Sequence, residues 1–223
     1  MGTPVRQDGR SFLNLPQNVQ QNIFQNILVV VHPLYIFQEP GSEIIEVFAP
    51  DKPRRWISLL LGSRQLHDKA AETFYGANHF VMMDTEARQT RLIQSFLNRI
   101  GPASAGHLRH LSINFPVADQ RDEGNDTILK EDDACSLRLL QKNCGRLMTL
   151  ELIVQARNAA DLALSSQGGE IPARLRKFLS KVDEQVRAIP SLTKLVVKWY
   201  AKPASIELAD EMRQLGWTVV KGK

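Results

Sequence analysis

The fold is decided by the stretch Leu59–Met83, which reads LLLGSRQLHDKAAETFYGANHFVMM. A helix is predicted by apolar residues at helical spacing, namely Leu59, Leu66, Ala70 and Phe74. Gly76 is placed to end that helix in a left-handed turn. The apolar run His79–Met83 then favours a strand. The stretch therefore predicts a helix that leads directly into a strand.

Composition indicates a globular protein rather than a membrane or secreted one. Hydrophobic residues make up 43% of the 223 residues and charged residues 23%, and the net charge is +4. The longest aliphatic run, Ile27–Val31, is too short to span a bilayer, and the first ten residues lack the apolar core of a signal peptide. Two cysteines fit a reducing compartment. We therefore expect a cytoplasmic or nuclear protein without a membrane segment.

N-terminal to this stretch, the sequence predicts a tail over residues 1–11, an amphipathic helix and a hairpin. Pro16 suits the first turn of the helix, and Val19, Ile23 and Ile27 form one apolar stripe beside a face of uncharged amides. The hairpin is indicated by two apolar runs, 33–37 and 44–48, with a Pro-Gly turn between them.

C-terminal to it, helices and strands alternate. Gly101-Pro102 is expected to stop the first of these helices, Ser205 to cap the last one and Gly216 to end it. Polar loops are predicted over residues 116–131 and around 165–169. The helices are expected near 85–100, 132–144, 172–189 and 205–215, and the strands at 79–83, 108–115, 147–154, 192–199 and 217–220.

Three of these strands share one pattern. Leucines or other aliphatic residues recur in the frame L-x-x-L-x-(I/L/V) at 108–113, 147–152 and 192–197, each time after a predicted helix. This frame is the strand signature of leucine-rich repeats, at spacings longer than usual. Together with the hairpin, it predicts an α/β fold in which a short parallel βα array follows an N-terminal helical unit.

Two segments resemble the halves of an F-box-like motif found in fungal proteins. The first half opens with Leu15-Pro16 and continues as the amphipathic helix. The second half, about thirty residues later, matches at Leu60, Leu61, Arg64, Gln65, Tyr75, Gly76, Asn78 and Phe80. F-box proteins often carry leucine-rich repeats after the motif. The resemblance implies an F-box-like unit with a hairpin insertion over residues 12–78 and a leucine-rich-repeat-like domain over 79–223.

The same resemblance implies a function in protein binding. F-box proteins are substrate-recognition subunits of cullin-based ubiquitin ligases, which they join through a Skp-type adaptor. By this resemblance, the residues that face the adaptor are Leu15, Pro16, Ile23, Ile27 and Leu28. The alternative is that these five side chains pack against residues 59–74 and the repeat core. Outside such a complex we expect a monomer.

Motifs for catalysis, cofactors and metals are absent from the sequence. It contains no phosphate loop, dinucleotide fingerprint, nucleophile elbow or zinc-binding helix. His107 and His110 have a metal-like spacing, but no cysteine pair lies nearby to complete four ligands, so we interpret them as surface or partly buried histidines. We expect no enzyme activity, no cofactor and no metal site.

Basic residues concentrate near the C-terminus and suggest an alternative. Residues 171–223 hold eleven Lys or Arg and five Asp or Glu, and Arg174, Lys177 and Lys181 share one helix face. Such a face fits a nucleic-acid-binding protein, although no nucleic-acid-binding motif accompanies it. We favour the interpretation that it is a solvated helix face.

The strand pattern also predicts which face of the sheet binds a partner. Since side chains alternate along a strand, the leucines that point inward turn their neighbours outward. Those neighbours are mostly polar, whereas a sheet covered on both faces would show continuous apolar runs. We expect helices on one face and a bare opposite face, where the partner contacts two rows of residues: Ser112, Glu151 and Val196, then Asn114, Ile153 and Lys198.

Overall fold

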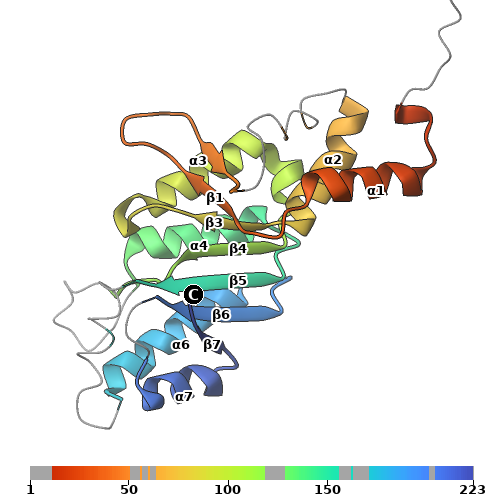
Figure 1. Ribbon diagram of the computed structural model, residues 1–223. Helices are drawn as coiled ribbons and strands as arrows, with labels where there is room; N and C mark the ends of the chain where they lie inside the picture. Colours follow the sequence, from red (N-terminus) through yellow and green to blue (C-terminus); the bar gives the residue numbers. More distant parts are fainter. Residues whose placement is uncertain are drawn as a thin grey trace, which may run out of the picture.

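The computed structural model describes residues 12–50, 56, 60, 64–118, 129–155, 162, 171–200 and 204–222. These residues form one mostly parallel sheet of seven strands in the order β2-β1-β3-β4-β5-β6-β7 (Figure 1). Only β1 and β2 pair antiparallel, as the predicted hairpin. The strands are β1 Leu34–Phe37, β2 Glu46–Phe48, β3 His79–Met82, β4 His110–Asn114, β5 Thr149–Val154, β6 Lys194–Trp199 and β7 Thr218–Lys221.

Six helices of the described chain pack on this sheet. They are α1 Gln17–Leu28, α2 Arg64–Ala77, α3 Glu86–Ala105, α4 Glu131–Asn143, α6 Ala173–Arg187 and α7 Ile206–Gln214. In Figure 1, α3, α4 and α6 lie behind strands β3 to β6, and the front of these strands carries no labelled helix. None of the described helices is long and apolar enough to cross a bilayer.

The hydrophobic core lies on one face of the sheet. The buried leucines of the predicted frame, such as Leu111, Leu150 and Leu195, belong to one continuous core with the helices. The buried apolar residues that alternate with them, Ile153 and Val196, do not belong to that core. Among the described residues, helices α3, α4 and α6 therefore lie on the core face of strands β3 to β6.

The predicted boundary between residues 78 and 79 runs through a continuous structure. The hairpin strand β1 pairs in parallel with β3, with Leu34 opposite Phe80. Side chains from α1, α2 and the following strands share the same core. The hairpin is thus an extension of the sheet rather than part of a separate N-terminal unit.

Helix α2 does not end at Gly76, which was expected to form a left-handed turn. Positive φ angles among the described glycines occur only at Gly41, Gly101 and Gly216. The helix continues to Ala77, and the next residue, Asn78, ends it with its side chain. Its Nδ2 donates to the carbonyl oxygens of Phe74, at 2.9 Å, and of Leu28, at 2.8 Å.

Other predicted helix ends are confirmed. Gly101 has φ 76° and ψ 165° and interrupts α3 just before Pro102, after which one further turn follows. The Ser205 side chain accepts a hydrogen bond from the backbone N–H of Leu208, and Gly216 follows α7 with φ 82°. The predicted tail 1–11 and the larger parts of both predicted polar loops lie outside the described residues.

The two faces of α1 give a stability prediction. Leu28 is fully buried, whereas its neighbour Ile27 is 36% exposed. Leu28→Ala should lower the free energy of unfolding by about 2–5 kcal/mol, because it removes buried methyl groups and leaves a cavity. Ile27→Ala should cost clearly less, about 1 kcal/mol or below. Urea denaturation of both variants measures the difference; equal losses would contradict this packing.

Candidate functional site

The outward-facing residues of the sheet stand in the two predicted rows. Ser112 pairs with Glu151 and Glu151 with Val196 across β4, β5 and β6. Asn114, Ile153 and Lys198 form the second row in the same way. A further row, which begins with His79 opposite His110, lies next to the first. The register of the strands is therefore as predicted, and the role in partner binding stays a prediction.

Glu151 is the centre of a polar network on this face, which we call the Glu151 cluster: His79, His110, Ser112, Glu151 and Lys198. His110 Nε2 donates to Glu151 Oε1 at 2.9 Å. Ser112 Oγ and Lys198 Nζ both donate to Glu151 Oε2, at 3.0 Å and 2.7 Å. His79 Nε2 lies 2.7 Å from Ser112 Oγ. The carboxylate thus accepts three hydrogen bonds from two neighbouring strands.

Burial and the surrounding charges shift the protonation of this cluster. Burial alone would raise the pKa of Glu151, but hydrogen bonds from His110 and Lys198 and the charges of His79 and Lys198 lower it to about 2. Burial, followed by the charge of His110, lowers the pKa of His79 to about 4. At neutral pH, Glu151 is therefore a carboxylate and His79 a neutral imidazole.

The expectation of a bare sheet face is wrong. Of the six residues in the two predicted rows, five are buried, with Ser112 at 1% and Glu151 at 6% exposure, and only Lys198 is partly exposed. For Ser112 and Glu151 the reason is chemical complementarity across the strands: donors of β4 and β6 lie against the carboxylate of β5. A partner on this face would first meet the rim of the cluster, at His110 and Lys198.

The cluster does not have the geometry of a hydrolytic triad. In a triad, the serine hydroxyl donates to a histidine whose other ring nitrogen donates to the carboxylate. Here Ser112 Oγ donates directly to Glu151, and both histidines reach the cluster through Nε2. The hydroxyl is already committed to the carboxylate, so Ser112 is a structural donor.

His107 and His110 are both half-buried, as interpreted from the sequence, and the histidine that contacts His110 is His79. His107 is separated from the cluster, and its Nδ1 lies 3.2 Å from Arg146 Nη1. His110 stacks instead on His79, with ring centroids 3.6 Å apart and planes 4° from parallel. A signal was present in the sequence, because His79 and His110 both immediately precede the first inward apolar residue of their strands, Phe80 and Leu111.

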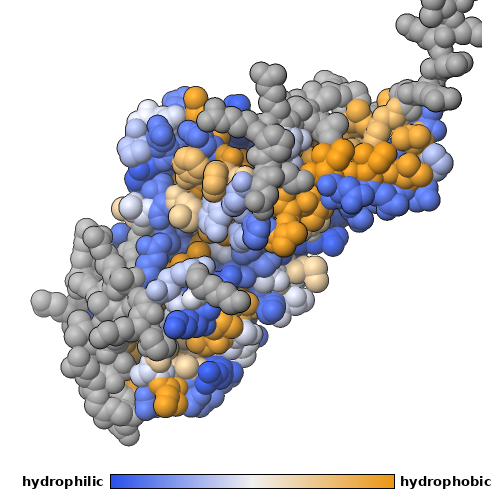
Figure 2. Space-filling view, viewed as in Figure 1, coloured by the Kyte–Doolittle hydropathy of each residue, from blue (hydrophilic) through white to orange (hydrophobic). Residues whose placement is uncertain are grey.

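Helix α1 carries the second candidate site. Its residues Phe24 and Leu28 point into the core, and Gln20 bonds to backbone carbonyls of the preceding turn. Beside this inward face lies an apolar band of exposed and half-buried side chains, which we call the α1 stripe: Leu15, Val19, Ile23, Ile27 and Val31. Figure 2 shows apolar surface running along this helix, above a band of polar amides.

The five residues that the family resemblance assigns to an adaptor surface differ in their exposure. Leu15, Pro16 and Ile27 are exposed and Ile23 is half-buried. Leu28 is completely buried, so its assignment to an adaptor surface is wrong. The reason is the helical period: Leu28 lies four residues after Phe24 and shares its inward face.

Two other arginines of α6, outside the predicted basic face, pair with neighbouring acids. Arg176 pairs with Glu211 at 3.4 Å, and Arg187 pairs with Asp183 at 2.6 Å. Arg174 and Lys177 are exposed and Lys181 is half-buried, on the outer side of the helix. The nucleic-acid alternative stays a prediction that these contacts do not strengthen.

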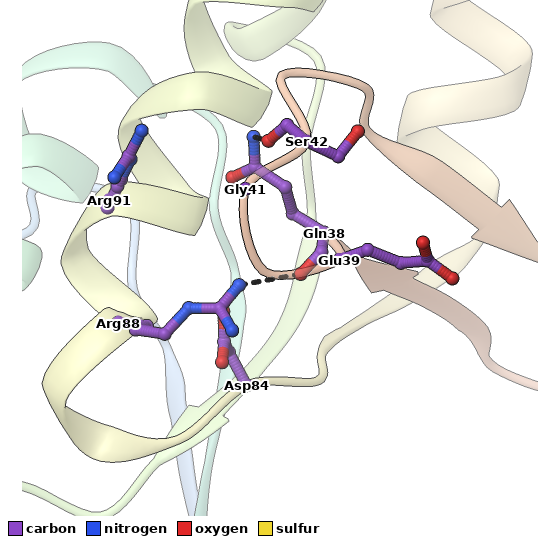
Figure 3. Close-up of a pocket in the computed structure, with 7 residues that line it drawn as sticks. All are labelled: Gln38, Glu39, Gly41, Ser42, Asp84, Arg88 and Arg91. Carbon is purple, nitrogen blue, oxygen red and sulfur yellow. Dashed lines mark hydrogen bonds and ion pairs between the residues drawn. The ribbon is translucent and has the colours of Figure 1, made fainter.

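A small hollow lies between the hairpin turn and the start of α3 (Figure 3). It encloses about 260 Å³, including space open to solvent. Arg88 donates to the Gln38 carbonyl at 2.7 Å and pairs with Asp84 at 3.3 Å. The Gln38 side chain donates to the Ser42 carbonyl at 2.7 Å. These bonds fix the hairpin turn against α3. The polar groups that line the hollow therefore have a structural role.

Comparison with protein-family models, with curated proteins and with solved structures gives no significant match. The likeness to F-box-like proteins therefore depends on the residues of the sequence alone.

The Glu151 cluster predicts a loss of stability in acid. Because the pKa values of His79 and Glu151 are both lower in the folded chain, the unfolded chain binds more protons as the pH falls. Stability should be complete above about pH 6.5. It should decrease first as unfolded His79 takes up a proton, and then between about pH 4.5 and pH 2 through Glu151.

Urea midpoints measured from pH 7 to pH 3 test this prediction. His79→Asn should flatten the upper part of the profile and Glu151→Gln the lower part. His107→Asn is the matched control outside the cluster and should keep the wild-type profile. A wild-type midpoint that rises on acidification would contradict the assigned protonation states.

Proposed function

We propose that this chain is a non-catalytic protein-interaction module that docks onto a Skp-type adaptor through the α1 stripe. The proposal makes it a substrate-recognition subunit of a cullin-based ubiquitin ligase, with an F-box-like helix before a leucine-rich-repeat-like sheet. The observation that carries it is the α1 stripe, an apolar band on the surface of a helix whose adjoining face, with Phe24 and Leu28, packs into the core.

The shape and chemistry of the stripe suit a helical docking surface. Val19, Ile23 and Ile27 are four residues apart, so they align along one side of a helix about 18 Å long. Helices that insert into apolar grooves use anchors at this spacing. The remaining side chains around it are mostly amides, including Gln21, Asn22 and Asn26, which can form a polar rim without charge repulsion.

The inner face of α1 holds the stripe in position. Phe24 packs against Phe12 with the rings tilted by 57° and their centroids 5.2 Å apart, and Gln21 donates to Thr73 of α2 at 3.2 Å. Lys69 of α2 donates to Gln20 at 3.2 Å. These contacts fix the rotation of the helix, so a partner would not need to order it. A preordered surface loses less conformational entropy on binding.

Adaptor capture tests the proposal. In a pull-down with a purified Skp-type adaptor, Ile23→Asp with Ile27→Asp should reduce binding at least tenfold, because two carboxylates would be buried in an apolar contact. The matched control is Asn22→Asp with Asn26→Asp, which adds the same charge to the same helix on exposed amide positions. This control should bind like the wild type.

Circular dichroism separates lost binding from lost folding. The docking role predicts that the Ile23/Ile27 variant keeps its helical signal. If the wild-type protein does not capture the adaptor, or if the amide control loses binding equally, the docking role of α1 is wrong.

A further inference from the structure

Three side chains of the Glu151 cluster are potential metal ligands. His79, His110 and Glu151 each offer one ligand atom, and these atoms all lie within 4.8 Å of one another. His110 Nε2 is 2.9 Å from Glu151 Oε1, and His79 Nε2 is 3.7 Å from Glu151 Oε2. A tetrahedral zinc ion with bonds near 2.1 Å holds its ligand atoms about 3.4 Å apart. We propose that these three residues form a binding site for a divalent transition-metal ion of the zinc class.

The parallel strands bring the ligands together without any mobile loop. His79, His110 and Glu151 project from β3, β4 and β5, on the face opposite the core. The two imidazole rings stack in parallel, so their Nε2 atoms lie side by side. In the metal-free chain His110 Nε2 donates its proton to Glu151, so metal binding requires the neutral rings to carry their proton on Nδ1, which frees the Nε2 lone pairs. A shared ion requires each ring to turn about its Cβ–Cγ bond, a torsion with a broad energy minimum in histidine. The partial exposure of His110 leaves the fourth coordination position to water.

Lys198 occupies the cation position in the metal-free chain. Its ammonium lies 2.7 Å from Glu151 Oε2, the oxygen that also accepts from Ser112. A metal ion would exchange with this ammonium, and Lys198, which is partly exposed, could turn toward solvent. Ser112 would keep its bond to the carboxylate and orient it, as partners of metal ligands commonly do. The lysine is therefore a competitor of the metal rather than a ligand.

The donor set selects the class of ion. Two imidazole nitrogens and one carboxylate oxygen suit zinc, iron, nickel or copper, whereas magnesium and calcium prefer oxygen ligands alone. The site is independent of adaptor docking, because it involves neither α1 nor α2. It also departs from the expectation, drawn from the sequence, that the chain binds no metal.

Calorimetric titration of the tag-free full chain with Zn²⁺ tests the proposal at neutral pH. The expected result is one high-affinity ion per chain and no comparable binding of Mg²⁺. His79→Gln and His110→Gln should each weaken Zn²⁺ binding at least about 100-fold, a loss beyond that of a residue that merely supports a ligand. His107→Gln, the same change outside the cluster, should leave the affinity unchanged.

Lys198→Gln gives the outcome that a purely structural network does not predict. Removal of the competing ammonium should tighten Zn²⁺ binding, by roughly tenfold. The site is refuted if the folded wild-type chain binds no stoichiometric Zn²⁺, if His107→Gln removes binding, or if Lys198→Gln weakens it. Melting curves of the metal-free variants show whether each variant is folded. If a histidine variant does not fold, the Zn²⁺ affinity of Lys198→Gln decides whether the cluster is a metal site.

Discussion

The parallel register of β3, β4, β5 and β6 is the constraint on which both the core and the polar face depend. Strands lie about 4.8 Å apart, so residues at the same height in neighbouring strands contact one another. With Leu111, Leu150 and Leu195 aligned on the helix side, alternation places Ser112, Glu151 and Val196 on the other side. A slip of one residue would exchange the two faces and bury Glu151 among the leucines.

The sequence predicted the parts of the fold that follow from local geometry. The period of two along a strand is fixed by the backbone, so the outward rows followed once the leucines were assigned inward. Gly101 and Ser205 act within their own turns, and their roles were also predictable. The end of α2 was not, because Asn78 bonds to the carbonyl of Leu28, fifty residues earlier. The spacing of residues within α2 carries no information about a contact with so distant a residue.

The Glu151 cluster could not be predicted from the alternation of residues along each strand, for a related reason. Alternation shows which residues share a face, but the pairing of their side chains depends on which strands become neighbours. Lys198 and Glu151 are 47 residues apart, and His79 and Ser112 are 33 apart. Polar residues on a sheet face suggest solvent exposure when each strand is considered alone. Here they are complementary across strands, and they cover one another.

The two candidate sites differ in the kind of ligand that their chemistry suits. On α1 the exposed side chains are apolar, and a partner that covers them gains free energy without having to replace a hydrogen bond. At Glu151, by contrast, a partner must compete with three donors, and a buried carboxylate left with fewer bonds is costly. A neutral or weakly polar protein surface cannot compensate for that loss. A divalent cation can, because it exceeds the charge of the lysine that it replaces. We therefore propose protein docking for α1 and ion binding for the cluster.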